Sequence, residues 1–370
     1  MSFRSLYYDF RTVQAIFLHG SPRCGPRIAQ LNISDNCNLD CVICNRSSMG
    51  VSGLLDTSRV LSLVRELYQM GTQEIFYHGF GEPACHPGLP EIINHVAVHC
   101  RELRQHIVTN GTWNSPELRR ALTAGKVRIR FSLHAGDEDT WKRIHPRDDA
   151  NNFIQAADNL RQLTASTPEN IEVLYVICRA NCHAIAAMVD FARENGVKKI
   201  LFRPMRLFRN RHGAYMNDSQ MPTEQEFGKA AALIAHYQTK LRGRICLQSV
   251  PFEQNSYDIG QGRPSSWTFY LSRSCYIGYV LTVIERDGNV WGCLPESSDG
   301  HPLGNIHERS FREIWNGEEY RLFRRKQLFL NKAVLDHKGC HSYCQHLETN
   351  IRLNRIKPWR RRMPADPGVK

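Results

Sequence analysis

The chain lacks the apolar runs that a membrane protein needs. No stretch approaches the ~18 consecutive apolar residues that span a bilayer, and residues 1–5 do not begin an apolar signal-peptide core. We therefore expect a cytoplasmic protein with no membrane partner. Internal repeats and low-complexity segments are also missing. The chain has 370 residues, of which 42% are hydrophobic, and this hydrophobic content is higher than in disordered proteins. The length suits one large or two modest domains.

Acidic residues are in deficit. The 36 Asp and Glu face 48 Lys and Arg, which gives a net charge of +12. Positive charge attracts nucleic acid, phosphate or carboxylate groups. Much of the excess lies in residues 352–362, a basic run with one tryptophan. Because charge alone carries no sequence specificity, this run is predicted to be a solvated tail, and nucleic acid is not the expected partner.

Cysteine, in contrast, is abundant and odd in number, at 13 residues. Disulfides are rare in the cytosol, so this count suggests metal or redox chemistry. Cys37, Cys41 and Cys44 form a C-x3-C-x2-C loop after the strand-like run 28–33. Iron–sulfur clusters are normally held by four thiolates, so three would leave one iron of a four-iron cluster open to a substrate or cofactor. A zinc site or unrelated buried thiols are the alternatives.

Strand-like and helix-like stretches alternate between residues 28 and 250. The strand-like runs begin near Ile28, Glu74, Gln105, Val127, Ile171 and Lys198. This alternation predicts an α/β fold with a parallel sheet and crossover helices. Six units fit a partial (β/α)6 TIM-like barrel better than a full eight-stranded one, and active residues should lie at the C-terminal strand ends. The predicted units are a lead-in at 1–27, the barrel at 28–250, a small C-terminal module at 251–350 and a basic tail at 351–370.

Several candidate site residues follow these strand-like runs. Residues 74–78 lead into Gly79-Phe80-Gly81-Glu82-Pro83, where glycines permit close backbone approach. Arginines at two later strand ends are predicted to clamp a carboxylate or phosphate, since arginine pairs with both in a bidentate manner. Cys178 and Arg203 are the predicted catalytic residues. The other candidates at strand ends are Asn110, Ser132, His134, Arg179, Cys182 and Arg206.

A second cysteine group lies near the C-terminus. Residues 251–266, rich in Gly, Ser, Pro and Asn, are predicted to link it to the barrel. Asp287-Gly288 between two β-rich runs signals a hairpin. Four thiolates can hold one iron–sulfur cluster completely, or one structural zinc ion. The four cysteines are Cys275, Cys293, Cys340 and Cys344.

Together these motifs resemble those of the radical S-adenosylmethionine (SAM) superfamily. The cysteine loop has the family spacing, and residues 80–83 match its GGEP motif with Phe80 in place of the first glycine. The C-terminal group, with Gly-Asn-Ile at 304–306 and Ile-Trp at 314–315, resembles the auxiliary-cluster modules called SPASM and Twitch. Its cysteine count suits the shorter Twitch type.

The resemblance implies the cofactors and their ligands. Cys37, Cys41 and Cys44 would hold a 4Fe-4S cluster whose open iron binds SAM, and the C-terminal cysteines would hold a second, auxiliary 4Fe-4S cluster. With an electron from a flavodoxin- or ferredoxin-type donor, SAM would yield a 5′-deoxyadenosyl radical that takes a hydrogen atom from a substrate. The implied SAM-binding residues are Gly79, Gly81, Glu82, Pro83, Asn110, Ser132 and Arg179.

The leading expectation is a radical SAM oxidoreductase with a small polar substrate. The Twitch pattern resembles dehydrogenases that oxidise a cyclitol, so the expected substrate is a carbohydrate or cyclitol alcohol in natural-product biosynthesis. An epimerase, with Cys178 or Cys182 as hydrogen donor, is an alternative. So is a maturase of ribosomal precursor peptides (RiPPs), although the short lead-in argues mildly against it. An RNA-modifying iron–sulfur protein is the further alternative, given the basic tail.

Overall fold

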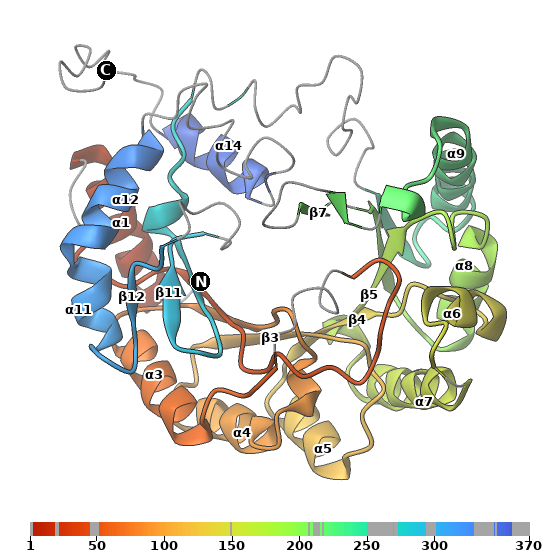
Figure 1. Cartoon of the computed structure of the whole chain (residues 1–370), viewed down its shortest axis with the longest axis horizontal. Helices are drawn as coiled ribbons and strands as arrows, with labels where there is room; N and C mark the ends of the chain where they lie inside the picture. Colours follow the sequence, from red (N-terminus) through yellow and green to blue (C-terminus); the bar gives the residue numbers. More distant parts are fainter. Residues whose placement is uncertain are drawn as a thin grey trace.

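A single curved sheet forms the centre of the molecule, and helices cover its outer face (Figure 1). The computed structural model describes residues 3–18, 22–44, 52–148, 150–205, 208–209, 215–216, 218–249, 269, 273–293, 301–328, 344 and 346–356. Within them the sheet has the order β12-β11-β10-β1-β2-β3-β4-β5-β6-β9. Its strands are β1 (Ile28–Leu31), β2 (Glu74–Tyr77), β3 (Arg104–Thr109), β4 (Arg128–Ser132), β5 (Ile171–Ile177), β6 (Lys199–Pro204), β9 (Cys246–Ser249), β10 (Leu281–Ile284), β11 (Asn289–Trp291) and β12 (Gly304–Asn305).

Helices connect the parallel strands, and their starts are set by local sequence. The Asp56 side chain accepts a hydrogen bond from the Arg59 backbone at the start of α3, and Ser115 caps α5 in the same way. Thr223 and Glu226 form a capping box on α9. The helices after the strands are α3 (Thr57–Gln69), α4 (Leu89–His99), α5 (Pro116–Ala124), α6 (Glu138–Ile144), α7 (Ala150–Ser166), α8 (Ile185–Glu194) and α9 (Glu224–Lys240). A small antiparallel pair, β7 (Phe208–Arg209) and β8 (Tyr215–Met216), lies outside the main sheet.

The parallel strands confirm the predicted α/β barrel. Strands β1 to β6 pair with one another in chain order, and every pairing among them is parallel. Right-handed crossovers through helices make this the expected arrangement for alternating strands and helices. All C-terminal strand ends therefore meet at one edge of the sheet, where the predicted site motifs lie.

The C-terminal module extends this sheet, which the sequence patterns did not predict. Strand β10 pairs in parallel with β1, with Ile28 opposite Leu281, and all four of its residues are buried. Strands β11 and β12 then follow as antiparallel neighbours. The remaining elements of this side are η5 (Ile277–Tyr279), α11 (Phe311–Asn316), α12 (Glu318–Leu328) and α14 (Leu347–Ile356).

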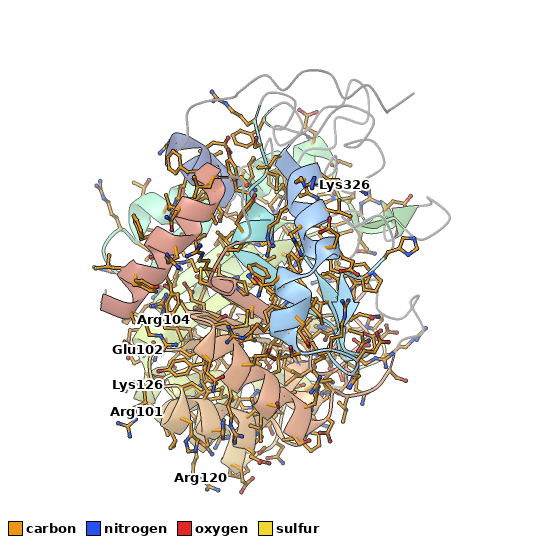
Figure 2. The ribbon with its side chains drawn as sticks, turned by 90° about the vertical axis from the view of Figure 1, so that its left-hand side faces the viewer. Arg101, Glu102, Arg104, Arg120, Lys126 and Lys326 are labelled. Atoms are coloured by element: carbon orange, nitrogen blue, oxygen red, sulfur yellow. The ribbon has the colours of Figure 1, made fainter. Side chains whose placement is uncertain are left out.

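The lead-in is a helix that belongs to the same side. Helix α1 (Phe3–Leu18) places Ala15 and Ile16 in an apolar cluster with η5, β10 and Leu328 of α12. Figures 1 and 2 show α1 and α12 on one flank of the molecule, with Lys326 on α12. The unit boundaries drawn from the sequence remain predictions, but residues 3–18 pack with the C-terminal module rather than standing apart.

Positive charge is also present away from the predicted tail. Arg101, Arg104, Arg120 and Lys126 are exposed, and Figure 2 shows Arg101, Arg120 and Lys126 at the end of the molecule opposite Lys326, with Arg104 between. The predicted solvated tail, residues 351–370, is wrong for its first six residues, which belong to α14, where Asn354 donates a hydrogen bond to the Ser274 carbonyl, and residues 357–370 lie outside the described residues. None of the described helices combines the length and the apolar character that crossing a membrane requires.

On strands β2 to β4, the inner face of the sheet is less completely buried than the outer face. On β2, Ile75 and Tyr77 are fully buried in the cluster that includes the helices, whereas Phe76 between them is only partly buried. Strands β3 and β4 repeat this alternation. A closed TIM barrel fills its interior with packed side chains. In the open sheet here, the residues of β2–β4 that face away from the helices are only partly buried.

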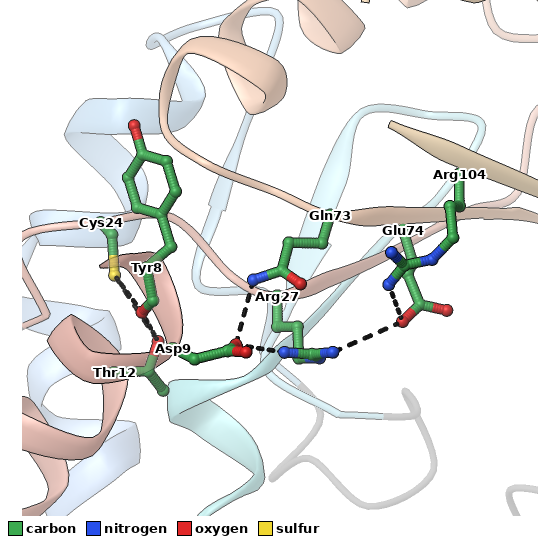
Figure 3. Close-up of polar contacts among 8 residues, drawn as sticks. All are labelled: Tyr8, Asp9, Thr12, Cys24, Arg27, Gln73, Glu74 and Arg104. Carbon is green, nitrogen blue, oxygen red and sulfur yellow. Dashed lines mark hydrogen bonds and ion pairs between the residues drawn. The ribbon is translucent and has the colours of Figure 1, made fainter. Parts of the chain in front are cut away.

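Ion pairs join α1 to the starts of the strands (Figure 3). Arg27 contacts both Asp9 of α1 and Glu74 of β2, and Gln73 donates a 3.0 Å hydrogen bond to Asp9. Glu74 also accepts a 2.8 Å bond from Arg104 and lies 3.1 Å from the ring nitrogen of His106. Burial alone would raise the pKa of Glu74, but the nearby His106 ring and the hydrogen bond from Arg104 prevail and hold it at about 2.

Replacing Glu74 with Gln should lower the free energy of unfolding at neutral pH by about 2–3 kcal/mol. A depressed carboxyl pKa stabilises the fold above the unfolded value of about 4.3, and this stabilisation is lost as pH falls toward the folded pKa of about 2. Urea unfolding of E74Q should therefore depend less steeply on pH than that of the wild type between about pH 4.5 and 2, because the contribution of Glu74 is gone while other carboxyls with lowered pKa, such as Glu172, remain. Glu117→Gln, an exposed partner of Arg120, is the control and should leave the midpoint unchanged. Equal midpoints for E74Q and wild type would contradict this.

Candidate active site

The first cysteine group lies in the loop that follows β1. The backbone of Cys44 donates a 3.0 Å hydrogen bond to the carbonyl of Cys41, which forms a tight turn. Cys37 and Cys41 pack against the main core, and Cys44 is exposed. Burial raises the pKa of the Cys41 thiol well above its usual value, and charge on Cys44 and Cys37 raises it further. The three sulfur atoms are thus close enough for a charge on one to change the pKa of another.

This donor set fits an iron–sulfur cluster. Thiolates are the ligands that such clusters take, and each thiolate of a four-iron cluster binds a different iron. Within the described part of the chain, no three His, Cys, Asp or Glu side chains are arranged to hold one metal ion. The fit therefore rests on the chemistry of three cysteines on one loop, of which Cys44 is open to solvent.

The glycine motif after β2 packs directly on this cysteine loop. A Cβ atom on Gly79 would lie 2.1 Å from the side chain of Asn32, and one on Gly81 would lie 2.3 Å from the carbonyl oxygen of Ser34. The backbone of Glu82 donates a 2.8 Å hydrogen bond to the carbonyl of Asn36. Side chains at the two glycines would push the loops apart, so these glycines position the cysteine loop whatever they contact in SAM.

The carboxylate of Glu82 joins the ends of β2 and β3. It accepts hydrogen bonds from the Thr109 hydroxyl at 2.6 Å, the Asn110 backbone at 2.7 Å and the Ala84 backbone at 3.0 Å. Its burial raises its pKa despite these donors. Pro83 follows as the first residue of the short helix η1 (Pro83–Cys85). The Glu82 side chain therefore holds the ends of β2 and β3 together. The Gly-Glu-Pro motif at 81–83 did not by itself indicate this structural role.

Asn110 braces the cysteine loop from β3. Its amide nitrogen donates a 2.9 Å bond to the side-chain oxygen of Asn38, which lies between Cys37 and Cys41. Asn38 in turn donates a 2.6 Å bond to the Thr112 hydroxyl. Thr112 returns a 2.8 Å bond to the Asn110 side chain. This closed ring of polar side chains fixes the part of the loop between the first two cysteines, and sequence reasoning missed both Asn38 and Thr112.

The hairpin of the C-terminal module holds the start of the same loop. The Arg286 guanidinium donates a 2.6 Å hydrogen bond to Asp35, which is almost fully buried two residues before Cys37. Asn32 donates 2.6 Å and 3.0 Å bonds to Asp35 and Glu285. The Arg286–Asp35 ion pair thus joins the two cysteine-bearing parts of the chain, although its residues lie 251 positions apart in the sequence.

Arg286→Ala should reduce occupancy of the first cluster to about half and lower the free energy of unfolding by about 2–3 kcal/mol, because Asp35 would be left buried without its cation. Arg286→Lys should recover most of both losses. Arg309→Ala, which removes a looser 3.7 Å surface pair in the same module, serves as the control. Iron and sulfide content after anaerobic reconstitution tests this, and full content in R286A would contradict it.

His134, at the end of β4, is held in an unusual backbone conformation with φ of +57°. Its Nδ1 accepts a 3.1 Å hydrogen bond from the Val176 backbone, which leaves the proton on Nε2. Burial and the charge of His145 lower its pKa to about 3, so the ring is neutral near pH 7. Asn181 donates a 2.9 Å bond to the His134 carbonyl and accepts a 2.8 Å bond from the Cys178 backbone.

The structure separates the remaining candidates. Cys178 is fully buried with Met205 and Ile144, in a cluster that also contacts Cys41, and burial raises its pKa to about 11. The Arg179 side chain is half exposed and lies 3.9 Å from Glu226 of α9. Ser132 and Arg203 are partly buried on the inner face. Buried Cys182 lies beside Arg179, while Arg206 lies outside the described residues.

The second cysteine group gathers around the other apolar cluster. Cys275 is part of that cluster, and Cys293 and Cys344 pack against it together with residues of η5 and β10. Cys340 lies outside the described residues. Three thiols around one apolar cluster give the donor set that an auxiliary iron–sulfur cluster would use.

Family models match the two segments of the chain that carry the cysteine groups. A model of the radical SAM superfamily matches residues 31–200, and a model of the iron–sulfur cluster-binding domain SPASM matches residues 275–352. A PqqA peptide cyclase of Xanthomonas campestris pv. campestris is 24% identical over 362 residues, covering 93% of this chain and 89% of its own. An AdoMet-dependent heme synthase of Methanosarcina barkeri is 24% identical over 343 residues, covering 86% and 91%.

Solved structures share the fold. Streptococcus suis SuiB gives a TM-score of 0.65 at 14% identity, covering 92% of this chain and 76% of that one. The protein anSMEcpe with bound AdoMet gives a TM-score of 0.60 at 16% identity, covering 90% of this chain and 96% of that one.

The predicted cofactors, SAM with two iron–sulfur clusters, agree with both matched domains. The chain is a radical SAM enzyme and belongs to the radical SAM superfamily, with a SPASM iron–sulfur domain at its C-terminal end.

Proposed function

We propose that this enzyme modifies a peptide, as a radical SAM maturase of a ribosomal precursor. The supporting observation is that similarity to the PqqA peptide cyclase runs through both domains, over 93% of this chain and 89% of the relative. SuiB, which has the same fold, has been solved with its precursor peptide SuiA. The open, partly accessible inner face of β2–β4 offers an extended surface beside the strand ends.

The predicted oxidation of a carbohydrate or cyclitol is less well supported. By their names, the relatives described above act on a peptide or on heme synthesis. The peptide maturase, an alternative in the sequence analysis, therefore replaces it as the leading function. The expected small-molecule partner is replaced by a peptide, while the flavodoxin- or ferredoxin-type donor remains a prediction.

In this proposal, Cys37, Cys41 and Cys44 hold the SAM-binding cluster, and Gly79, Gly81 and Pro83 present backbone to SAM. When bound, cluster and SAM supply the 5′-deoxyadenosyl radical that takes a hydrogen atom from the peptide. Asn38, Asn110 and Glu82 keep the cysteine loop in place. The remaining proposed ligands and contacts are Ser132, Arg179 and Arg203 around SAM or substrate, and Cys275, Cys293, Cys340 and Cys344 on the auxiliary cluster.

His134 and Cys178 have distinct proposed roles at the strand ends. The ring of neutral His134 is held by the backbone of β5, through the Val176 N–H and the Leu174 carbonyl, so its orientation is fixed. Cys178, predicted as catalytic, is fully buried behind the cysteine loop. Its protonated thiol is therefore proposed to support the loop through packing, and hydrogen donation from it would need that packing to open.

The experiment compares candidate substrates with the anaerobically reconstituted enzyme, SAM and dithionite. Short peptides encoded beside the gene form one panel, and sugars and cyclitols form the other. We expect a peptide to raise 5′-deoxyadenosine formation at least tenfold and to change mass by loss of hydrogen, or to take up solvent deuterium if it is epimerised. Stimulation by a cyclitol with a ketone product, and none by peptides, would overturn the proposal.

A further inference from the structure

Helix α14 carries a buried amide that contacts a cysteine sulfur. Asn350 is fully buried, and its Nδ2 donates a 3.5 Å hydrogen bond to Sγ of Cys275. The same nitrogen donates to the His346 carbonyl at 3.3 Å, and Oδ1 accepts a 2.7 Å bond from the Tyr276 backbone. Asn350 thus joins α14 to the segment around Cys275 by both ends of its amide.

The chemistry of this contact suits a metal-bound sulfur. Burying an amide among apolar side chains is unfavourable unless its hydrogen bonds are made, and a thiolate is a far stronger acceptor than a neutral thiol. Hydrogen bonds to ligand sulfurs help to set the reduction potential of an iron–sulfur cluster. A donor stabilises the reduced form, because reduction places more negative charge on the sulfur.

We propose that Asn350 raises the reduction potential of the auxiliary cluster through this bond to Cys275. The inference rests on the proposed role of Cys275 as a ligand of that cluster. It makes Asn350 a positioning and tuning residue, since its side chain acts through the ligand sulfur and reaches no substrate.

The same helix provides a matched control. Asn354, one turn further along α14, donates 2.9 Å and 2.8 Å bonds to the carbonyls of Ser274 and Asn350. It therefore fixes α14 to the same segment through the same chemical group, but its bonds end on oxygen. A change caused by a loosened helix should appear in both variants, whereas a change caused by the sulfur contact should appear only at Asn350.

The test is a redox titration followed by EPR on the full chain with Cys37, Cys41 and Cys44 replaced by Ala, so that only the auxiliary cluster contributes. At a fixed applied potential, Asn350→Leu should lower the ratio of reduced to oxidised cluster three- to tenfold, where tenfold corresponds to about 59 mV for a one-electron couple. Asn354→Leu should change it less than twofold. Equal ratios in wild type and N350L, or equal shifts in both variants, would overturn the proposal.

A second measurement avoids the risk that N350L fails to fold. The protein with native Asn350, in the same cysteine background, is labelled with 15N in its asparagine side chains. Pulsed EPR of the reduced auxiliary cluster should then show a 15N coupling. If the cluster is present but shows no such coupling, the hydrogen bond is wrong and the cluster assignment still stands. If the protein with Cys37, Cys41 and Cys44 replaced by Ala contains no iron, both this inference and the assignment of the auxiliary cluster are wrong. Failure of the hydrogen bond can therefore be told apart from failure of the auxiliary-cluster assignment.

Discussion

Replacing Cys37, Cys41 and Cys44 with alanine should reduce SAM cleavage to the background of the assay. These thiols are the proposed ligands of the cluster that delivers the electron to SAM, and no other group on the cysteine loop supplies that chemistry. The protein should still fold, because Cys44 is exposed, and Cys37 and Cys41 pack at the margin of the core without belonging to its fully buried residues. The variant should also keep its auxiliary cluster, and therefore about half of the wild-type iron.

The measurement is iron and sulfide content with EPR, alongside 5′-deoxyadenosine formation, after anaerobic reconstitution. Cys246→Ala is the control, because Cys246 is an exposed cysteine on β9, outside both groups. It should retain full iron and full activity. Wild-type iron content in the triple variant would show that the cluster is held elsewhere. One cluster in the wild type and none in the variant would instead make the C-terminal cysteines a zinc or structural site.

Glu82→Ala should weaken SAM binding about 10- to 100-fold, with a matching loss of first-cluster occupancy. The substitution leaves Thr109, Asn110 and Ala84 without the acceptor that the carboxylate provides. Hydrogen bonds to a charged group contribute about 1.5–3 kcal/mol each, and the losses are not additive. Because Asn110 also holds Asn38, the disturbance should pass from the strand ends to the cysteine loop.

Glu82→Gln separates this brace from simple loss of volume. Its amide oxygen can still accept from Thr109 and Ala84, but its NH2 group faces the Asn110 backbone donor, so an intermediate affinity is expected. Glu117→Ala on the exposed face of α5 should bind SAM like the wild type. Binding is measured by equilibrium dialysis of the reconstituted proteins. Wild-type affinity in E82A would show that the carboxylate does not position the loop.

Local patterns were sufficient to predict the barrel and the cysteine loop. The six strand starts were predicted within about one residue because each strand is a short apolar run bounded by turn residues. The cysteine loop was found from its spacing, which is entirely local. The glycines of the β2 loop were assigned to SAM by resemblance, whereas the structure adds a packing reason at Gly79 and Gly81 that depends on Asn32 and Ser34.

Contacts between distant segments could not be predicted in this way. No local pattern shows that Arg286 reaches Asp35, that β10 extends the barrel sheet, or that α1 packs under the C-terminal module. Arg179 was predicted to clamp SAM from its strand-end position, yet its side chain lies beside Glu226. His134 was one of several candidates at strand ends, because a single histidine carries little signal, and the contact that fixes its ring comes from the neighbouring strand β5.

Hydrogen transfer from a peptide is the most direct test of the proposed chemistry. The reconstituted enzyme is incubated with SAM, dithionite and a candidate precursor peptide carrying deuterium on its side chains and α-carbons, and 5′-deoxyadenosine is analysed by mass spectrometry. A peptide-modifying radical SAM enzyme should move deuterium from the modified residue into 5′-deoxyadenosine. If 5′-deoxyadenosine stays unlabelled with every peptide but gains deuterium from a labelled cyclitol, the peptide substrate is wrong. If none forms although both clusters are present, SAM cleavage itself is contradicted.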